Sequence, residues 1–336
     1  MKRVLISVGI FVGLLAIVAV VMEVTATARQ QAMRYFRTRS VFQYQPGNVV
    51  YDPALGYRLT PGLDVAFTNA EFSTRVRTNT IGFRDDDASL QGAQVWFLGD
   101  SYSFGWGVEE PDGVEKQYER ATGKRVLNMS VPGYSNIQEM LMLMKWAHAS
   151  PVTGIDVYLF LSSNDFIDNE NTSFDAFPYF VEQGGSIALA KPLEASFSAW
   201  QETVNRWMIT GTAARKSMLA YYAAAAVKNL SVRDVYSGYR SGKTAVPGNK
   251  AFLLVTQQLA QFAKERQSRV TVVYIPPTSG NKAAQQLPFL RKVCGTLGLR
   301  LLDLSPVLTA GDYYPLDKHW TPAGHAKVAA WLVQQP

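Results

Sequence analysis

The chain has 336 residues, 47% of them hydrophobic, which is enough for one large domain or two modest ones with a sizeable core. Its net charge of +6 does not indicate nucleic-acid binding, because residues 1–40 hold six basic residues and one acidic residue and so carry most of the excess. The single cysteine, Cys294, excludes an intramolecular disulfide and a metal site built on cysteines, and we expect neither a metal nor a cofactor.

An uncharged apolar run at residues 4–22 is the first predicted element. As a helix it is roughly 28 Å long, close to the hydrocarbon thickness of a bilayer. Lys2 and Arg3 precede it, which predicts a single-pass signal anchor at residues 1–25 in the inner (cytoplasmic) membrane, with the rest exported to the periplasm or cell exterior. Four arginines after the run favour the opposite orientation by charge alone, but long domains translocate largely regardless of charge. Small residues at 26–28 leave a cleaved signal peptide as the alternative.

Residues 26–92 are expected to hold a stalk followed by a small β element. The sequence up to residue 40 continues the helical pattern of the anchor, with arginines that can meet phospholipid head groups. Residues 63–83, LDVAFTNAEFSTRVRTNTIGF, alternate as two short antiparallel strands would.

From residue 93 the pattern changes to short apolar runs that alternate with helical stretches. Strands are expected in AQVWFLG (93–99), KRVLNMSV (124–131), IDVYLFLSS (155–163), SRVTVVYIPP (268–277) and LRLLDLS (299–305). Helices are expected around 110–122, 135–148, 250–266, 283–297 and 322–333. Buried strands separated by helices predict an α/β fold with a mainly parallel sheet and helices on both faces. Residues 173–245 interrupt the alternation and are interpreted as a helical insertion that serves as a lid, a partner surface or an elaborated edge.

The first of these strands ends in Gly99-Asp100-Ser101. Gly99 permits a tight turn, and Ser101 then lies at the carboxyl edge of the sheet, where the following backbone amides point outward. Sites in parallel sheets form at this edge, so Ser101 is a candidate nucleophile. A bare Gly-Asp-Ser is also a common helix cap, and the choice between these readings depends on the other strand ends.

The next two strand ends carry groups suited to binding an oxyanion. A Pro-Gly turn exposes the amide of Gly133 without a side chain to block approach, and Asn164 offers a side-chain amide. Of the three histidines, His319 follows the last strand and lies two residues after Asp317, which could hold its ring through the Nδ1 proton. His148 lies near a helix C-terminus, and His325 is expected to be structural.

These blocks, in this order, resemble the SGNH, or GDSL, hydrolase superfamily. The similarity covers residues 93–334, and the run DPALGYRLTPG…TNTIGFRDD resembles the preceding region of its membrane-anchored bacterial members. The resemblance implies a flavodoxin-like three-layer α/β/α sandwich without a cofactor. It also implies a nucleophile, an acid–base pair and an oxyanion hole, formed by Ser101, by Asp317 with His319, and by Ser101, Gly133 and Asn164.

Two positions depart from the family pattern. Ser162 stands where the third block usually has Gly, and Asp317-Lys318-His319 is one residue shorter than the usual Asp-x-x-His. An Asp-x-His-Trp block resembles the acetyltransferase-like members that act on exopolysaccharides.

The resulting functional hypothesis is a serine esterase that acts on O-acyl groups through a covalent acyl-enzyme, with a small-molecule or polysaccharide ester as substrate. The alternatives are a polysaccharide O-acyltransferase with the same triad, served by a membrane-bound acyl-donor partner, and a non-catalytic glycan-binding or assembly protein that retains the fold. Trp106 and Trp320 follow the nucleophile and base segments, and either stack on a sugar ring or pack in the core.

Overall fold

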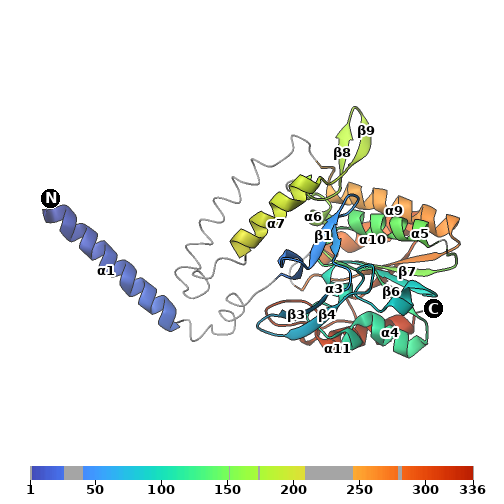
Figure 1. The fold of residues 1–336 in the computed structure, drawn as a ribbon, viewed down its shortest axis with the longest axis horizontal. Coiled ribbons are helices and arrows are strands. Elements are labelled where there is room, and N and C mark those ends of the chain that lie inside the picture. Colours follow the sequence, from blue (N-terminus) through green and yellow to red (C-terminus); the bar gives the residue numbers. More distant parts are fainter. Residues whose placement is uncertain are drawn as a thin grey trace.

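The computed structural model describes most of the chain. The described residues are 2–25, 41–150, 152–172, 175–208, 245–278 and 282–335. They form a domain with an extended N-terminal helix, α1 (Lys2–Thr25), beside it (Figure 1). Residues 26–40, expected to form the stalk, lie outside the described residues.

The N-terminal apolar run is part of α1. In the part of the chain that the structure describes, no helix combines the length and the apolar character needed to cross a membrane. The transmembrane segment expected over residues 4–22 is therefore not supported.

A five-stranded parallel sheet forms the centre of the domain. Its strands are β5 (Val95–Leu98), β6 (Val126–Asn128), β7 (Asp156–Leu161), β10 (Arg269–Tyr274) and β11 (Arg300–Asp303). The spatial order is β11-β10-β7-β5-β6, and every pairing within the sheet is parallel. Numbered within the sheet alone, this is the 2-1-3-4-5 order of flavodoxin-like doubly wound proteins. The chain reverses its direction of strand addition at β5, so the topological switch point lies between the carboxyl ends of β5 and β7, where such sheets bind ligands.

Helices cover both faces of the sheet (Figure 1). One layer contains α5 (Asn136–Ala149), α9 (Gly248–Glu265) and α10 (Lys282–Leu297), and the other contains α4 (Val114–Thr122) and α11 (Pro322–Val333). Side chains alternate between the layers: Trp96 and Leu98 of β5 pack with the first, whereas Val95 and Phe97 pack with the second. The predicted α/β class with a mainly parallel sheet is therefore confirmed.

Two antiparallel hairpins precede the sheet and share its core. They are β1 (Val49–Asp52) with β2 (Gly56–Leu59), and β3 (Asp64–Thr68) with β4 (Ser73–Arg77). Tyr57, Leu59 and Phe67 are almost fully buried in the cluster that also contains Trp96 and Leu98. We call residues 41–92 the flanking segment, and it is packed onto the α/β domain as part of one hydrophobic core.

The segment expected to be a helical insertion begins with β structure. An antiparallel hairpin, β8 (Tyr179–Gln183) with β9 (Ser186–Ala190), projects from the domain, and α7 (Glu194–Met208) follows it (Figure 1). Residues 209–244 lie outside the described residues. Trp200 of α7 stacks on Tyr57 at 5.7 Å between ring centroids, so α7 packs against the flanking segment.

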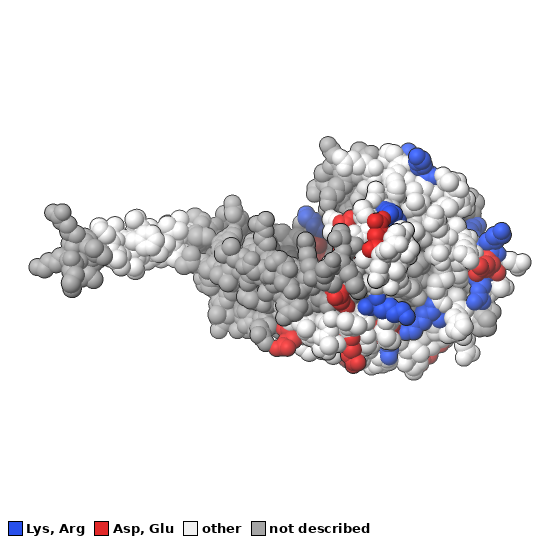
Figure 2. All heavy atoms as spheres, turned by 90° about the horizontal axis from the view of Figure 1, so that it is seen from above, with Lys and Arg blue, Asp and Glu red and all other residues white. Residues whose placement is uncertain are grey.

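Charged side chains do not form a single patch on the face that Figure 2 shows. There, Lys and Arg lie among Asp and Glu, and much of the surface carries neither sign of charge.

Candidate active site

The turn after β5 presents Ser101 at the carboxyl edge of the sheet. A Cβ on Gly99 would lie 2.2 Å from the Ser103 hydroxyl oxygen, so the close approach requires glycine. Asp100 caps the short helix α3 (Ser101–Phe104), because its carboxylate accepts a hydrogen bond from the amide of Tyr102 at 3.0 Å. The capping role therefore falls to Asp100, and the hydroxyl of Ser101 remains available.

Ser101, His319 and Asp317 form a continuous chain of contacts. Ser101 Oγ lies 2.7 Å from His319 Nε2, and His319 Nδ1 lies 2.5 Å from Asp317 Oδ1. The Asp317 side chain is 3% exposed and that of His319 is 21% exposed, so the carboxylate is sheltered while the ring borders solvent. This is the arrangement of nucleophile, base and orienting acid found in serine hydrolases.

Aromatic side chains hold the His319 ring from two sides. Trp106 stacks on it with 5.0 Å between centroids and 25° between planes, and Tyr102 lies at the same distance with its ring tilted. Trp106 is 5% exposed and Trp320 is fully buried, so neither indole presents a face to solvent. Of the two readings of these tryptophans, the structure favours core packing.

The loop after β6 brings Gly133 next to the nucleophile turn. Val131 donates a backbone hydrogen bond to the carbonyl of Gly99 at 3.0 Å, which ties the two strand ends together. Gly133 has a φ of +80°, and a Cβ there would lie 2.6 Å from Gln43 Nε2. Among the described residues, the amides of Ser101 and Gly133 have no hydrogen-bond acceptor. Both are free to donate to a substrate oxygen.

Asn164 lies at the end of β7, but its side-chain amide is engaged with protein groups. Nδ2 donates to Asp168 Oδ2 at 2.7 Å and lies 3.5 Å from Asp100 Oδ2, and Oδ1 lies 2.7 Å from Ser162 Oγ. The residue is exposed, so a substrate can approach it.

Ser162, which replaces the usual glycine, fits into a group of buried acids. Its hydroxyl oxygen is 2.9 Å from Asp100 Oδ2 and from Asp165 Oδ1 as well as close to Asn164. A hydroxyl has a single proton to donate, so the three contacts are satisfied together only if carboxyl groups carry protons.

Burial supports that protonation. Desolvation raises the pKa of Asp100, and raises those of Asp165 and Glu139 well above their usual range; nearby carboxylates add to the effect for the last two. Burial also raises the pKa of Asp168 to about 6. In the described part of the chain, no cluster of three or more His, Cys, Asp or Glu side chains is arranged to hold a metal ion.

The flanking segment contacts the loops that carry the site. Arg84, which is 1% exposed, donates to the carbonyls of Phe104, Gly105 and Val108. It thereby fixes the loop that presents Trp106 to His319.

Tyr57 acts similarly on the loop of Gly133. Its hydroxyl donates to the carbonyl of Pro132 at 2.7 Å, and the Tyr134 hydroxyl donates back to the carbonyl of Tyr57 at 2.5 Å.

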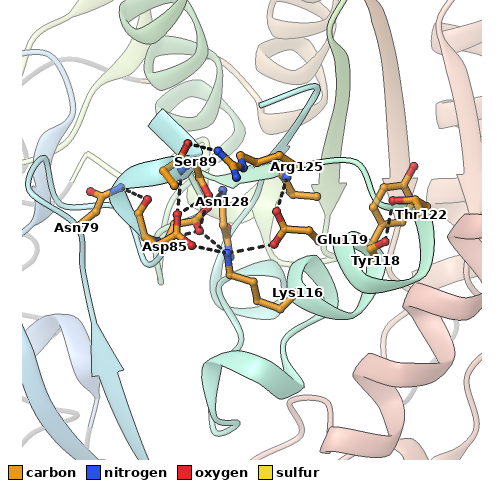
Figure 3. A network of polar contacts seen from close by, with 12 residues as sticks. Asn79, Asp85, Ser89, Lys116, Tyr118, Glu119, Thr122, Arg125 and Asn128 are labelled. Atoms are coloured by element: carbon orange, nitrogen blue, oxygen red, sulfur yellow. Dashed lines mark hydrogen bonds and ion pairs between the residues drawn. The ribbon is translucent and has the colours of Figure 1, made fainter. Parts of the chain in front are cut away.

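A polar network around Asp85, the residue after Arg84 in the chain, continues this support, and Figure 3 shows Asp85 with Lys116 and Asn128. Asp85 Oδ1 lies 2.5 Å from Lys116 Nζ, and Asp85 Oδ2 accepts from the amide of Asn128 at 3.0 Å. The Asn128 side chain donates to the carbonyl of Ser103 at 3.1 Å, so the network reaches the helix that begins with Ser101. Desolvation lowers the Lys116 pKa, but Asp85 and nearby acids more than offset this and raise it, so the cation is retained.

Sequence reasoning did not identify Arg84, Tyr57 or Asp85 as residues that support the site. The signal was that all three lie in the runs that resemble the preceding region of the family, Tyr57 in DPALGYRLTPG and Arg84 and Asp85 in TNTIGFRDD, but this resemblance gives no partner.

The remaining histidines have the environments expected for them. His325 is buried, its Nδ1 accepts from the amide of Val114 at 3.2 Å, and burial lowers its pKa to about 3. His148 is exposed in the last turn of α5.

A cavity of about 280 Å³ lies next to the catalytic turn. Its walls come from Tyr102, from the loop that carries Asn164, and from residues 275–278 after β10. The site therefore combines a serine in contact with a histidine, two backbone amides without an acceptor among the described residues, and a small adjacent cavity.

No protein-family model and no curated protein sequence matches the chain. Among solved structures, it is similar to a protein assigned to the lipolytic G-D-S-L family from Desulfitobacterium hafniense DCB-2, with 10% identity and a TM-score of 0.43 over 71% of this chain and 97% of that one. TesA gives 14% identity and a TM-score of 0.41, over 72% and 98% of the two chains. The esterase EstA from Pseudoalteromonas sp., solved in a form inhibited by monoethylphosphonate, gives 9% identity and a TM-score of 0.39, over 71% and 94%. At these identities, the functional conclusion rests on the geometry of the site.

Proposed function

We propose that this protein is a serine hydrolase of the SGNH type that cleaves carboxylic esters through an acyl-enzyme. The observation that carries the proposal is the chain of contacts from Asp317 through His319 to Ser101. A serine hydroxyl is a weak nucleophile until a base removes its proton, and His319 Nε2 lies at hydrogen-bond distance from it.

In the acylation half, His319 Nε2 takes the proton of Ser101 as Oγ attacks the ester carbonyl carbon and the carbonyl π electrons move to oxygen. Asp317 holds the ring through Nδ1 and stabilises the imidazolium. The tetrahedral intermediate then collapses, the bond to the alkoxy oxygen breaks, and His319 returns the proton to the departing alcohol. Water repeats the sequence on the acyl-enzyme, which releases the acid and restores Ser101.

The amides of Ser101 and Gly133 are suited to stabilise the oxyanion in both halves, because neither has an acceptor in the described part of the chain and the two follow adjacent strands. Asn164 joins them when its side-chain amide exchanges a hydrogen bond to Asp168 or Asp100 for one to the substrate oxygen. Its contact with Asp168 holds the side chain near the site before substrate binds.

The cavity indicates the size of the substrate. A space of about 280 Å³ beside Tyr102 and Asn164 is at the small end of the range for ligand pockets, about 300–1,000 Å³, which favours a small acyl group over a long chain. We therefore propose small O-acyl esters as the substrate class. The buried tryptophans give no support for recognition of a sugar by ring stacking.

The test is covalent labelling of the full chain with a fluorophosphonate probe, read by intact mass. Wild type is expected to gain one label, and Ser101→Ala and His319→Ala to gain none. Ser103→Ala is the matched control, because that serine lies in the same short helix with its hydroxyl bonded to Ser130. Failure of a folded wild type to label, or equal labelling of Ser101→Ala, would refute the proposal. Hydrolysis of p-nitrophenyl acetate in preference to the octanoate would support the substrate class.

A further inference from the structure

We propose that Asn69 and Glu71, in the turn between β3 and β4, are positioning residues that hold Asp317 against His319. This inference rests on the proposed function, because the contact that it explains is the one that orients the catalytic base. Neither residue belongs to the α/β sheet or to its connections.

Asn69 binds the carboxylate oxygen that His319 does not use. Its Nδ2 donates to Asp317 Oδ2 at 3.0 Å, whereas Asp317 Oδ1 faces His319 Nδ1. One partner on each oxygen fixes both the rotation and the tilt of the carboxylate. Asn69 is itself fixed, because it is 5% exposed and its side-chain oxygen accepts from the amide of Ala70 at 2.8 Å.

Glu71 binds the backbone at the same place. Its carboxylate accepts from the amide of Asp317 at 2.6 Å and from the amide of Leu316 at 3.0 and 3.1 Å. These are charge-assisted hydrogen bonds, the stronger class of such contacts. The two residues therefore hold Asp317 at its main chain and at its carboxylate.

The short spacer explains why such support is needed. With only Lys318 between acid and base, the two side chains converge through a left-handed backbone at Lys318, where φ is +73°. This conformation is unfavourable for a residue with a Cβ and persists only where surrounding contacts impose it. Glu71 binds the amide of Asp317, immediately before Lys318. The Tyr102 hydroxyl donates to the carbonyl of Lys318 at 3.2 Å.

Ring packing keeps the hairpin against the loop. Phe72 lies 5.4 Å from Tyr314 between centroids, and the Tyr314 hydroxyl donates to the carbonyl of Gly107 at 2.8 Å. The turn thus has a fixed position from which to act on Asp317.

The test compares Asn69→Ala, Glu71→Ala and Glu71→Gln in the full chain, with Ser73→Ala as the control in the same hairpin. Within the described ranges, the Ser73 hydroxyl pairs with Thr68 across the strands, at 2.9 Å, and not with the Asp317 loop, so its loss leaves that loop intact. The measurement is the rate of fluorophosphonate labelling, alongside the thermal unfolding midpoint. We expect each alanine variant to label about tenfold more slowly or worse, since small misplacements of catalytic groups are costly. Glu71→Gln is expected to retain most of the rate because its amide oxygen still accepts from both amides.

A positioning role also predicts non-additivity. In an Asp317→Ala background, Asn69→Ala should slow labelling less than twofold further, because the group through which it acts is gone. Wild-type rates in Asn69→Ala and Glu71→Ala, or the same tenfold loss in the Asp317→Ala background, would overturn the inference.

A second readout separates this inference from the proposed function. The proton on His319 Nδ1, bonded to Asp317, is expected as a downfield resonance in the proton NMR spectrum that is absent from Asp317→Ala. Asn69→Ala and Glu71→Ala should shift or broaden it, and Ser73→Ala should not. If wild type shows the resonance but is not labelled, the proposed function fails, and the resonance in the alanine variants still tests the inference. If the alanine variants leave the resonance unchanged, the inference fails whatever the labelling shows.

Discussion

Replacing Arg84 by methionine should destabilise the folded protein strongly. Methionine has a similar length and apolar stem but no donor, so the hydrogen bonds to the carbonyls of Phe104, Gly105 and Val108 are lost. The carbonyl of Gly105 also accepts from the amide of Val108 at 3.3 Å, and so keeps one partner. Two buried carbonyls, those of Phe104 and Val108, are left without a donor among the described residues.

The magnitude follows from that count. An unsatisfied buried polar group costs about 1–3 kcal/mol, so two of them give a loss of roughly 2–6 kcal/mol. Removing the guanidinium also removes its desolvation cost, which offsets part of this loss in the free energy of unfolding. The remaining loss is still a large fraction of the stability of a typical domain, about 5–15 kcal/mol.

The assay is urea unfolding followed by tryptophan fluorescence, with the free energy of unfolding extrapolated linearly to water. Arg58→Met is the matched control, because the Arg58 side chain is 35% exposed and makes only long contacts among those described, a 3.3 Å hydrogen bond to the carbonyl of Ile81 and a 4.0 Å ion pair with Asp52, which keeps Lys145 as a partner. We expect the control to lose less than about 1 kcal/mol. A loss below about 1 kcal/mol for Arg84→Met, at an unchanged denaturant slope, would refute the reasoning.

Two further predictions concern the edge of the site. Burial raises the Asp168 pKa from 3.8 to about 6, so folding favours the protonated form and the contribution of Asp168 to stability falls as pH rises from 4 to 7. Asp168→Asn should remove this contribution, so the difference in unfolding free energy between the two proteins should change by about 2 kcal/mol from pH 4 to pH 7 in urea unfolding. An equal difference at both pH values would contradict the prediction. Gly133→Ala should slow fluorophosphonate labelling at least tenfold, because its φ of +80° disfavours alanine and its Cβ would crowd Gln43. Gly154→Ala is the control, because Gly154 has a similar φ, +72°, but an added Cβ would have no atom within 4 Å. This variant should be less stable without being labelled more slowly. Equal slowing of labelling in both variants would assign the effect to backbone strain alone.

The elements of the sheet could be predicted because each depends on local sequence. The runs around Val95–Leu98 and Asp156–Leu161 are continuous and apolar, as strands covered on both faces must be. Helix starts were also local: α5 begins with the capping box of Ser135 and Gln138, and α11 begins after Thr321 with Pro322.

The site could be predicted only in part. Ser101, Asp317 and His319 were identified because each stands at a strand end or next to another reactive group, and the structure brings them together. Asn69 is 248 positions from Asp317 in the chain, and its sequence context is that of an ordinary hairpin turn. Nothing local distinguishes a turn asparagine from one that binds a catalytic acid.

The hairpin at residues 179–190 was not predicted, although its sequence carries a turn signal. Residues 179–190 were included in a helical insertion, yet Gly184-Gly185 between two alternating runs is typical of a two-residue hairpin. Both glycines have positive φ, 58° and 78°, as such a turn requires. The helix-favouring residues further along the segment outweighed this short pattern.

The flanking segment changes what counts as the smallest functional unit of this chain. A protein that began at residue 93 would contain every strand of the parallel sheet and all five residues proposed for the reaction. It would lack Tyr57 at the Gly133 loop, Arg84 at the loop before Val108, and Asn69 at Asp317. The part of the sequence that builds the sheet is therefore shorter than the part that sets the geometry of the proposed site, and transplanting or redesigning this site means carrying residues 41–92 with it.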